Sequence, residues 1–359
     1  MIRVLLVDDS EVCREVLREQ LEREGDIEVV GEAASGEQAL GRIETLAPDV
    51  ITLDIQMPGM GGLATIDEIM RRSPRPILVV TGLDTRERDL AVEATRRGAY
   101  AVANKVSIDD PEGAASLRAT VRSLAGSDLR AKRDEGARAT TQALAGTRSE
   151  SRSDDAHASA SWPTPVAGDT VPILAFGCSA GGPKALAELL DLLPRDIPAC
   201  LAVANHLPPD FVSAFARLLI TQHGFAVEIA TRPIAPAPGL LVLAPGGCDL
   251  AWESGMLTGR RARPDAPWCP RVDVLLETLA EAPGAHVGVV LSGLGSDGAQ
   301  GLAAMRARDK LTIVQDQASA AVWGMPRAAL VSAIEVLPIP RIADVIMQWL
   351  ASRGPRRLR

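Results

Sequence analysis

The sequence predicts an α/β protein with two mostly parallel sheets, one on each side of a central polar segment. Short apolar runs alternate with amphipathic stretches in both halves, which is typical of βα units and hence of doubly wound parallel sheets. Residues 127–169 consist mainly of Ala, Arg, Ser, Thr and Asp, and cannot bury enough apolar surface to offset the entropy of ordering. We therefore expect domains at residues 1–126 and 170–353, a flexible linker over 127–169, and a basic tail over 354–359.

Length and charge limit the classes of function. At 359 residues the chain is long enough for two domains, each with its own core. A formal net charge of −8 argues against nucleic-acid binding, which needs a basic face to neutralise phosphates. No apolar run approaches the roughly 18 residues of a membrane span, and the first apolar run is too short for a signal peptide. The five cysteines are scattered, without spacing for zinc or disulfides, so we expect reduced thiols, a cytoplasmic location and no direct membrane insertion.

The first half contains five βα units. Strands are expected at Ile2–Val7, Glu28–Ala33, Val50–Leu53, Pro76–Val80 and Tyr100–Ala103. Polar residues follow four of these strands: Asp8, Asp9, Asp54, Thr81 and Lys105. Each alone would be a helix cap or a turn residue, but the carboxyl ends of parallel strands share one edge, where ligands bind. Three carboxylates at one edge need a hard divalent cation, and an Asp beside Mg²⁺ can accept a phosphoryl group.

These segments resemble a known domain. The stretches are Val-Asp8-Asp9-Ser, Leu-Asp54-Ile-Gln-Met-Pro-Gly, Val-Thr81-Gly and Asn-Lys105, and they resemble the response-regulator receiver domain, which has a flavodoxin-like fold. The resemblance implies that Asp54 is the phosphoacceptor and that Thr81 and Lys105 sense the phosphoryl group. It also implies a Mg²⁺ site made by Asp8, Asp9, Asp54 and the carbonyl of Gln56. Two positions depart from the family pattern, because Val106 stands where proline is usual and Val102 where a switch aromatic is common; Tyr100 lies two positions earlier on the same strand face.

The second half is organised around a small-residue turn between an expected strand, Ile173–Phe176, and an expected helix, Pro183–Leu193. Gly177, Ser179 and Gly181 form Gly-x-Ser-x-Gly, which in a strand-turn-helix exposes a serine hydroxyl for nucleophilic attack. A connection without chemistry and a nucleotide site are the alternatives, although the glycine spacing departs from the dinucleotide fingerprint. Cys178 is a rival nucleophile, but a residue inside such a turn is expected to be buried and inert.

The partners of the serine are sought at the same sheet edge. Further strands are expected at Cys200–Ala204 and His286–Leu291, helices at Phe211–Gln222 and 298–308, and short strands or a hairpin over 239–260. His206 follows a strand at its carboxyl end, whereas His223 ends a helix and His286 begins a strand at the opposite edge. Asp297, in a glycine-rich turn after a strand, would orient the imidazole; its alternative role is the N-cap of the following helix. The order Ser, His, Asp differs from that of ordinary α/β-hydrolases.

A second resemblance covers this half. The stretches are Gly177-Cys-Ser-Ala-Gly-Gly, Asn205-His-Leu-Pro-Pro-Asp-Phe, Leu243-Ala-Pro-Gly-Gly, Ser292-Gly-Leu-Gly-Ser-Asp-Gly-Ala, Gln315-Asp-Gln-Ala-Ser and Trp323-Gly-Met-Pro-Arg. They resemble the catalytic domain of chemotaxis protein-glutamate methylesterases. The resemblance implies a Ser179, His206, Asp297 triad, with the N–H of Leu294 available to the oxyanion. The chain departs from the family at Asn205, where glutamine is usual, and at Trp268-Cys-Pro-Arg271, where a His-Arg-Pro-Ser-like run is usual.

Together the two resemblances imply a function. They imply a phosphorylation-regulated serine hydrolase that demethylates glutamyl methyl esters on cytoplasmic helices of chemoreceptors, and deamidates glutamines there. A chemotaxis-type histidine kinase would be the phosphodonor, Mg²⁺ would bind the receiver domain, and the catalytic domain would need no cofactor. The alternative is a phosphorylation-controlled module that binds receptors without catalysis.

Overall fold

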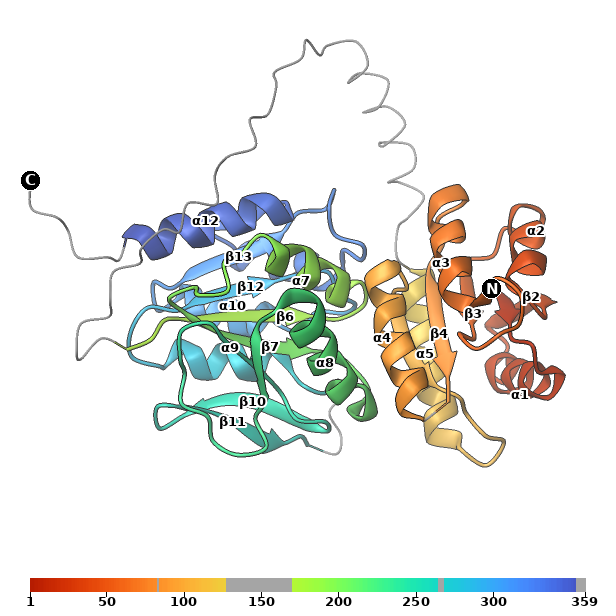
Figure 1. The fold of residues 1–359 in the computed structure, drawn as a ribbon, viewed down its shortest axis with the longest axis horizontal. Helices are drawn as coiled ribbons and strands as arrows, with labels where there is room; N and C mark the ends of the chain where they lie inside the picture. Colours follow the sequence, from red (N-terminus) through yellow and green to blue (C-terminus); the bar gives the residue numbers. More distant parts are fainter. Residues whose placement is uncertain (83, 127–169, 264–267, 353–359) are drawn as a thin grey trace, which may run out of the picture.

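Two α/β units built on separate sheets make up the computed structural model, which describes residues 1–82, 84–126, 170–263 and 268–352 (Figure 1). The linker expected over 127–169 and the tail expected over 354–359 lie outside the described residues. The predicted fold class is confirmed, because each unit contains a parallel sheet with helices packed on its faces.

The N-terminal unit has a five-stranded parallel sheet in the order β2-β1-β3-β4-β5. Its strands are β1 (Ile2–Val7), β2 (Ile27–Ala33), β3 (Val50–Leu53), β4 (Ile77–Thr81) and β5 (Ala101–Asn104). Its helices are α1 (Glu11–Glu22), α2 (Gly36–Leu46), α3 (Gly61–Arg72), α4 (Thr85–Arg97) and α5 (Pro111–Ala125). The predicted strands agree with the observed ones to within one residue, because strands covered on both faces are continuous apolar runs with sharp ends.

Short polar side chains set where most of these helices begin. Ser10, Ser35, Asp84 and Asp110 stand at the N-caps of α1, α2, α4 and α5, and each side chain accepts a backbone N–H from the first turn. Such caps satisfy donors that have no partner within the helix. The cap of α1, Ser10, directly follows Asp9, and the cap of α4, Asp84, lies three residues after Thr81, so helix initiation and the polar edge of the sheet are built from neighbouring parts of the chain.

The C-terminal unit has a seven-stranded sheet, parallel throughout, in the order β14-β13-β12-β6-β7-β9-β8, and a separate antiparallel hairpin. The sheet strands are β6 (Ile173–Cys178), β7 (Cys200–Asn205), β8 (Ala226–Ile229), β9 (Leu240–Leu243), β12 (Val287–Val290), β13 (Leu311–Gln315) and β14 (Glu335–Leu337). The hairpin is β10 (Cys248–Glu253) and β11 (Met256–Arg261), within the predicted 239–260 region apart from its last residue. The helices are α7 (Gly182–Asp191), η1 (Pro209–Phe211), α8 (Val212–His223), α9 (Val272–Ala280), α10 (Ala299–Arg306), α11 (Gly324–Ala329), η2 (Leu330–Ser332) and α12 (Ile339–Ser352).

The strand order decides where this unit can hold a site. The central strand β6 pairs with β7 on one side and with β12 on the other, so the chain runs outward in both directions from β6. In open α/β sheets such a reversal leaves a crevice beyond the carboxyl ends of the strands. The three loops that follow β6, β7 and β12 therefore meet at one place.

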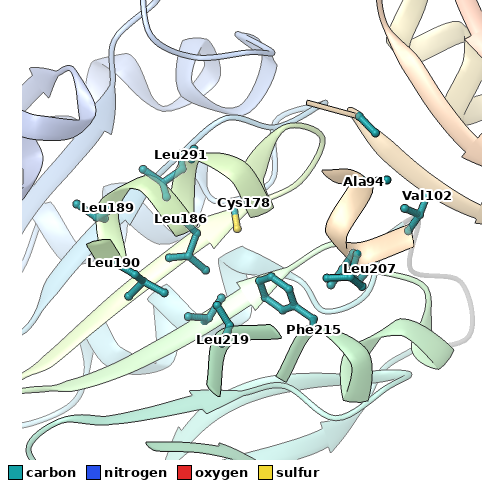
Figure 2. Close-up of a cluster of buried hydrophobic side chains, with 14 of the residues drawn as sticks. Ala94, Val102, Cys178, Leu186, Leu189, Leu190, Leu207, Phe215, Leu219 and Leu291 are labelled. Carbon is teal, nitrogen blue, oxygen red and sulfur yellow. The ribbon is translucent and has the colours of Figure 1, made fainter. Parts of the chain in front are cut away.

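The two units pack against each other through α4, which contacts α7, α8 and η1 (Figure 1). Ala94 and Val102 of the N-terminal unit belong to the same buried cluster as Leu207 and Phe215 of the C-terminal unit (Figure 2). An ion pair joins Asp89 of α4 to Arg217 of α8 at 2.5 Å. Val102, at the position where a switch aromatic is common, is thus a buried interface residue, with 7% of its surface exposed.

Within the described ranges, no helix combines the length and apolar character that crossing a bilayer requires.

Candidate active site

Ser179, His206 and Asp297 come from the three adjacent strands at the centre of the larger sheet. Ser179 directly follows β6, His206 directly follows β7, and Asp297 lies in the turn between β12 and α10. Because β7 and β12 both pair with β6 in parallel, the carboxyl ends of all three strands point to the same edge. The sheet therefore brings together the three residues that the sequence analysis predicted for one site.

The turn around Ser179 requires its glycines. Gly181 has a φ of +70°, and a Cβ at this position would lie 2.6 Å from the Cβ of Ala321. A Cβ on Gly177 would lie 2.0 Å from a methyl group of Val272. The N–H of Ser179 donates to the carbonyl of Ser292 at 3.0 Å, which ties the turn to the loop after β12. The sharp turn is thus imposed by packing on both sides, as the Gly-x-Ser-x-Gly pattern predicts.

Asp297 is held by four hydrogen bonds. Its Oδ2 lies 2.7 Å from Nε2 of His206 and accepts the N–H of Val272 at 2.7 Å. Its Oδ1 accepts the N–H groups of Asp273 at 2.9 Å and of Gly298 at 3.0 Å. The alternative prediction, an N-cap for its own helix, is wrong, because Gly298 is the N-cap of α10 and makes no side-chain cap. The carboxylate instead caps the start of α9, 24 and 25 residues earlier in the chain.

Asp273 of α9 makes the equivalent contact with the other helix: its carboxylate accepts the N–H of Gly301 in the first turn of α10 at 2.7 Å. Helices α9 and α10 are therefore capped reciprocally, each by an aspartate at the start of the other. Burial opposes the charge of Asp297, but the hydrogen bond and charge of His206, together with the two N–H groups of α9, outweigh it and hold the pKa of this carboxyl below its ordinary value. Burial, with the added repulsion of Asp297 and Glu277, raises the pKa of Asp273 to about 6 despite the bond from Gly301.

The imidazole of His206 is bonded to Asp297 through Nε2, and its other nitrogen is Nδ1. A carboxylate can only accept hydrogen bonds, so Nε2 of His206 is the donor in this bond, and in the neutral imidazole Nδ1 then has a free electron pair. Nδ1 is buried and has no hydrogen-bond partner among the described residues. Ser179 and His206 line the same cavity, of about 430 Å³, without a hydrogen bond between them. Such bonds are often absent before substrate binds.

The other histidines and the cysteine considered for this site make contacts that are typical of structural residues. His223 is buried, with its Nδ1 2.7 Å from Asp191 at the end of α7, and Nδ1 of His286 accepts the N–H of Ile173. Cys178 is completely buried, and this burial raises the pKa of its thiol. Leu294 lines the cavity beside Ser179.

Three contacts of the site could not be found from the sequence. The indole of Trp268 stacks on the imidazole of His206, with ring centroids 5.4 Å apart and planes 3° from parallel. The N–H of Gly181 donates to the carbonyl of Tyr100 in the N-terminal unit at 2.9 Å. The N–H groups of α9 hold Asp297. Each joins residues far apart in the chain, and the Trp268 segment departs from the pattern that the resemblance suggested; no local signal marks these contacts.

The N-terminal unit gathers its polar residues as predicted. Ligand oxygens of Asp8, Asp9 and Asp54 all lie within 4.8 Å of one another. Nζ of Lys105 lies 2.8 Å from carboxylate oxygens of Asp8 and of Asp54. Burial raises the pKa of Asp54, partly offset by Lys105, and the carboxylates outweigh burial to raise the pKa of the Lys105 ammonium.

Two further contacts extend from this acidic cluster. The hydroxyl of Thr81 donates to Oε2 of Glu87 in the first turn of α4 at 3.3 Å. The N–H of Gln56 donates to Oδ1 of Asp54 at 3.3 Å, which puts Gln56 next to the acidic cluster. Thr81 therefore connects the cluster to the helix that packs on the C-terminal unit.

Fold and site together define a class: a receiver-type α/β unit with an acidic pocket, followed by an α/β unit with a hydrolase-type group of Ser, His and Asp. Sequence comparison is consistent with both parts. Residues 4–115 match the response regulator receiver domain family, and residues 174–346 match the CheB methylesterase family.

Whole-chain relatives identify the particular family. The chain is 37% identical to a protein-glutamate methylesterase/protein-glutamine glutaminase of Xanthomonas euvesicatoria, over 96% of each chain. It is 34% identical to a protein of the same name from Methanospirillum hungatei, over 99% of each chain. Among solved structures, the Thermotoga maritima CheB methylesterase catalytic domain matches with 27% identity and a TM-score of 0.47, covering 50% of this chain and 99% of that one. The chain belongs to the family of CheB methylesterases that carry a receiver domain.

Proposed function

We propose that this protein is a phosphorylation-regulated protein-glutamate methylesterase and protein-glutamine glutaminase that acts on methyl-accepting chemoreceptors. The observation that carries the proposal is the bond between the carboxylate of Asp297 and Nε2 of His206, which leaves Nδ1 of this histidine unbonded among the described residues, with His206 and Ser179 lining one cavity. The names of the whole-chain relatives supply the substrate class. No feature of the described residues favours the alternative, a receptor-binding module without catalysis.

The proposed reaction starts with proton transfer from the hydroxyl of Ser179 to Nδ1 of His206. The serine oxygen attacks the ester carbonyl, and Asp297 stabilises the imidazolium that forms. The tetrahedral intermediate collapses, Nδ1 returns the proton to the methoxy oxygen, and methanol leaves. Water then attacks the glutamyl ester of Ser179 with His206 again as base, which releases glutamate and restores the serine. With a glutamine side chain the same steps release ammonia.

The negative charge on the carbonyl oxygen needs backbone donors that are not already engaged. The N–H of Ser179 donates to Ser292, and the N–H of Gly181 donates to Tyr100, so neither is free in this arrangement. Leu294 lies on the loop after β12 and lines the cavity next to Ser179. We assign the N–H of Leu294 to the oxyanion, as the resemblance to the methylesterases implies, because a backbone donor at the developing charge contributes most in a dry site.

We also propose that the receiver domain, residues 1–126, restrains the esterase domain, residues 170–353, by covering this edge. The cavity with Ser179 and His206 is closed on its other side by receiver residues of β5 and α5, among them Asn104 and Leu117. The bond from Gly181 to the carbonyl of Tyr100 ties the nucleophile turn itself to the receiver. A receptor helix cannot reach Ser179 while the two domains are packed in this way.

Phosphorylation of Asp54 by a chemotaxis-type histidine kinase would release the restraint. Asp8, Asp9, Asp54 and the carbonyl of Gln56 would hold Mg²⁺, and the set fits, because hard oxygen donors converge and Mg²⁺ would offset their repulsion. When bound, the ion would neutralise charge on the phosphoryl group, while Lys105 and the hydroxyl of Thr81 would bind its oxygens.

The contact between Thr81 and Glu87 gives this signal a route. A phosphoryl group that takes the hydroxyl of Thr81 breaks its bond to Glu87 and repels the Glu87 carboxylate. Glu87 is followed in α4 by Arg88 and Asp89, which pair across the interface with Asp210 and Arg217. Movement of α4 would therefore weaken the closed arrangement, even though valines occupy positions 102 and 106.

Methanol release from methylated chemoreceptor membranes tests the proposal. The wild-type protein with Mg²⁺ and a small-molecule phosphodonor should release methanol faster than the protein without them, and Ser179→Ala should release almost none. Unchanged release by Ser179→Ala would remove the enzyme assignment. The proposal places the protein in the cytoplasm with its receptors and kinase, and it requires no nucleic acid.

A further inference from the structure

Trp268 makes a ring contact with the proposed base. Its indole lies parallel to the imidazole of His206, with the centroids 5.4 Å apart and 3° between the planes, which is the geometry of an offset stack. Trp268 also lines the cavity that contains Ser179. Trp268 to Arg271 is also the segment that departs from the family pattern implied by the resemblance.

The segment that carries the indole is anchored on one side, and the edge of the indole is packed on the other. Three residues along the chain, the N–H of Arg271 donates to Oδ1 of Asp249 at 2.7 Å and its Nε to Oδ2 at 3.0 Å. Asp249 is buried, with 1% of its surface exposed, so it anchors this segment to β10. On the other side, a Cβ placed on Gly295 would lie 3.7 Å from Nε1 of Trp268, so the indole edge rests on the loop that contains Leu294. Trp268 is therefore a fixed surface against which a ring can lie.

His206 needs such a surface because of which nitrogen is bonded. The backbone N–H of His206 donates to the carbonyl of Cys178, and within the described part of the chain the ring makes one hydrogen bond, from Nε2 to Asp297. Both ring nitrogens lie off the line that extends the Cβ–Cγ bond across the ring, and Nδ1 lies farther from this line than Nε2. Rotation about Cβ–Cγ consequently displaces Nδ1 more than Nε2. This torsion has a broad energy profile, so the bond to Asp297 alone leaves the direction of Nδ1 weakly defined.

We propose that Trp268 is a positioning residue for the base: its indole face fixes the rotation of the His206 ring and thereby directs Nδ1 toward Ser179. The inference rests on the proposed function, in which His206 takes the proton of Ser179. A parallel stack opposes rotation, because a turned ring loses contact with the indole face. Asp297 then sets which nitrogen is protonated, and Trp268 sets where the other one points.

The test compares Trp268→Ala with Trp268→Phe in the full-length protein, with Mg²⁺ and phosphodonor present. We expect Trp268→Ala to lower kcat for methyl-ester hydrolysis by about 10- to 100-fold with KM nearly unchanged, the loss typical of a misplaced catalytic group. Trp268→Phe keeps a flat face and should restore most of kcat. The rate at which an organophosphorus fluoridate labels Ser179 should fall and recover in the same order, because that reaction needs the base but not the receptor substrate.

Trp252→Ala is the matched control, since Trp252 lies beside another histidine, His286, with centroids 6.1 Å apart, outside the cavity lining. It should leave kcat and the labelling rate unchanged, and thermal unfolding of all variants separates positioning from loss of fold. A rise in KM alone, an unchanged kcat in Trp268→Ala, or a Trp268→Phe variant as slow as Trp268→Ala would each overturn the inference. Failure of the proposed function is distinguishable, because Ser179→Ala would then remain active.

Discussion

Replacement of Asp297 by asparagine separates the charge of this side chain from its shape. The carboxylate accepts two hydrogen bonds at each oxygen, from His206 and Val272 at Oδ2 and from Asp273 and Gly298 at Oδ1. Asparagine offers one oxygen and one NH₂ group in the same space. One pair of donors must therefore face the NH₂ group.

The structure indicates which pair this will be. If the NH₂ group faces Asp273 and Gly298, two backbone donors lose their acceptor. If it faces His206 and Val272, one backbone donor is lost, because the imidazole can move its proton to Nδ1 and accept at Nε2. The second orientation is favoured by roughly one unsatisfied N–H, about 1–3 kcal/mol. In that orientation Nδ1 carries the proton and cannot act as a base.

We therefore expect Asp297→Asn to lower kcat by about 10⁴-fold, the loss that the same change causes in a serine protease triad. The free energy of unfolding should fall by roughly 1–3 kcal/mol for the unsatisfied N–H of Val272 and by up to about 1 kcal/mol for the charge lost at the start of α9. Methanol release and thermal unfolding measure the two effects. A folded Asp297→Asn variant with activity within about tenfold of the wild type would refute the assignment of the tautomer and of the third triad member.

Four further outcomes are expected. Ser179→Ala and His206→Ala should each abolish most methanol release, and the double variant should be little worse, because triad members act as a unit; additive losses would contradict a shared step. Cys178→Ala should keep kcat within about threefold, since the thiol is buried and its pKa is raised, and a large loss would point to the cysteine. Asp54→Ala should stay at the basal rate when phosphodonor and Mg²⁺ are supplied, and activation of this variant would show another phosphorylation route. Asp273→Asn should unfold at a higher temperature than the wild type above pH 6, but not below about pH 4. A folded-state pKa of about 6 means that the wild type loses stability as pH rises from the ordinary value of 3.8 through 6, and a pH-independent difference would contradict this.

Much of the fold followed from the sequence because its strands are buried on both faces. Continuous apolar runs such as residues 77–80 can be read directly, and polar residues that follow strands, Ser179 and His206 among them, must lie at the carboxyl edge of a parallel sheet. The order of strands could not be read in this way, since nothing local places β12 beside β6. The proximity of Asp297 to His206 was therefore a hypothesis until the sheet was described.

Contacts between distant segments could not be predicted from the sequence for the same reason. In the sequence Trp268 is only a departure from a family pattern, although its ring lies on His206. Val102 was noticed as the lack of an aromatic residue, whereas the structure buries it against the C-terminal unit. Packing between domains depends on which surfaces come into contact after each domain has folded. The periodicity of apolar residues along the chain reports secondary structure and does not indicate these contacts.

The hydrogen bond from Gly181 to Tyr100 joins two backbone segments of the same chain. It involves no side-chain atom of either residue. Point substitutions can alter how snugly neighbouring groups fit, but they leave this donor and acceptor in place unless proline enters position 181. Most side chains of the interface could thus be substituted during evolution while the backbone hydrogen bond between the receiver domain and the turn around Ser179 is kept. Sensitivity to the signal could drift, through residues such as Glu87 and Asp89, while the resting state stayed closed. For engineering, a constitutively open variant should be reached more readily by lengthening or reshaping the loop before β5 than by introducing new charges at the domain interface.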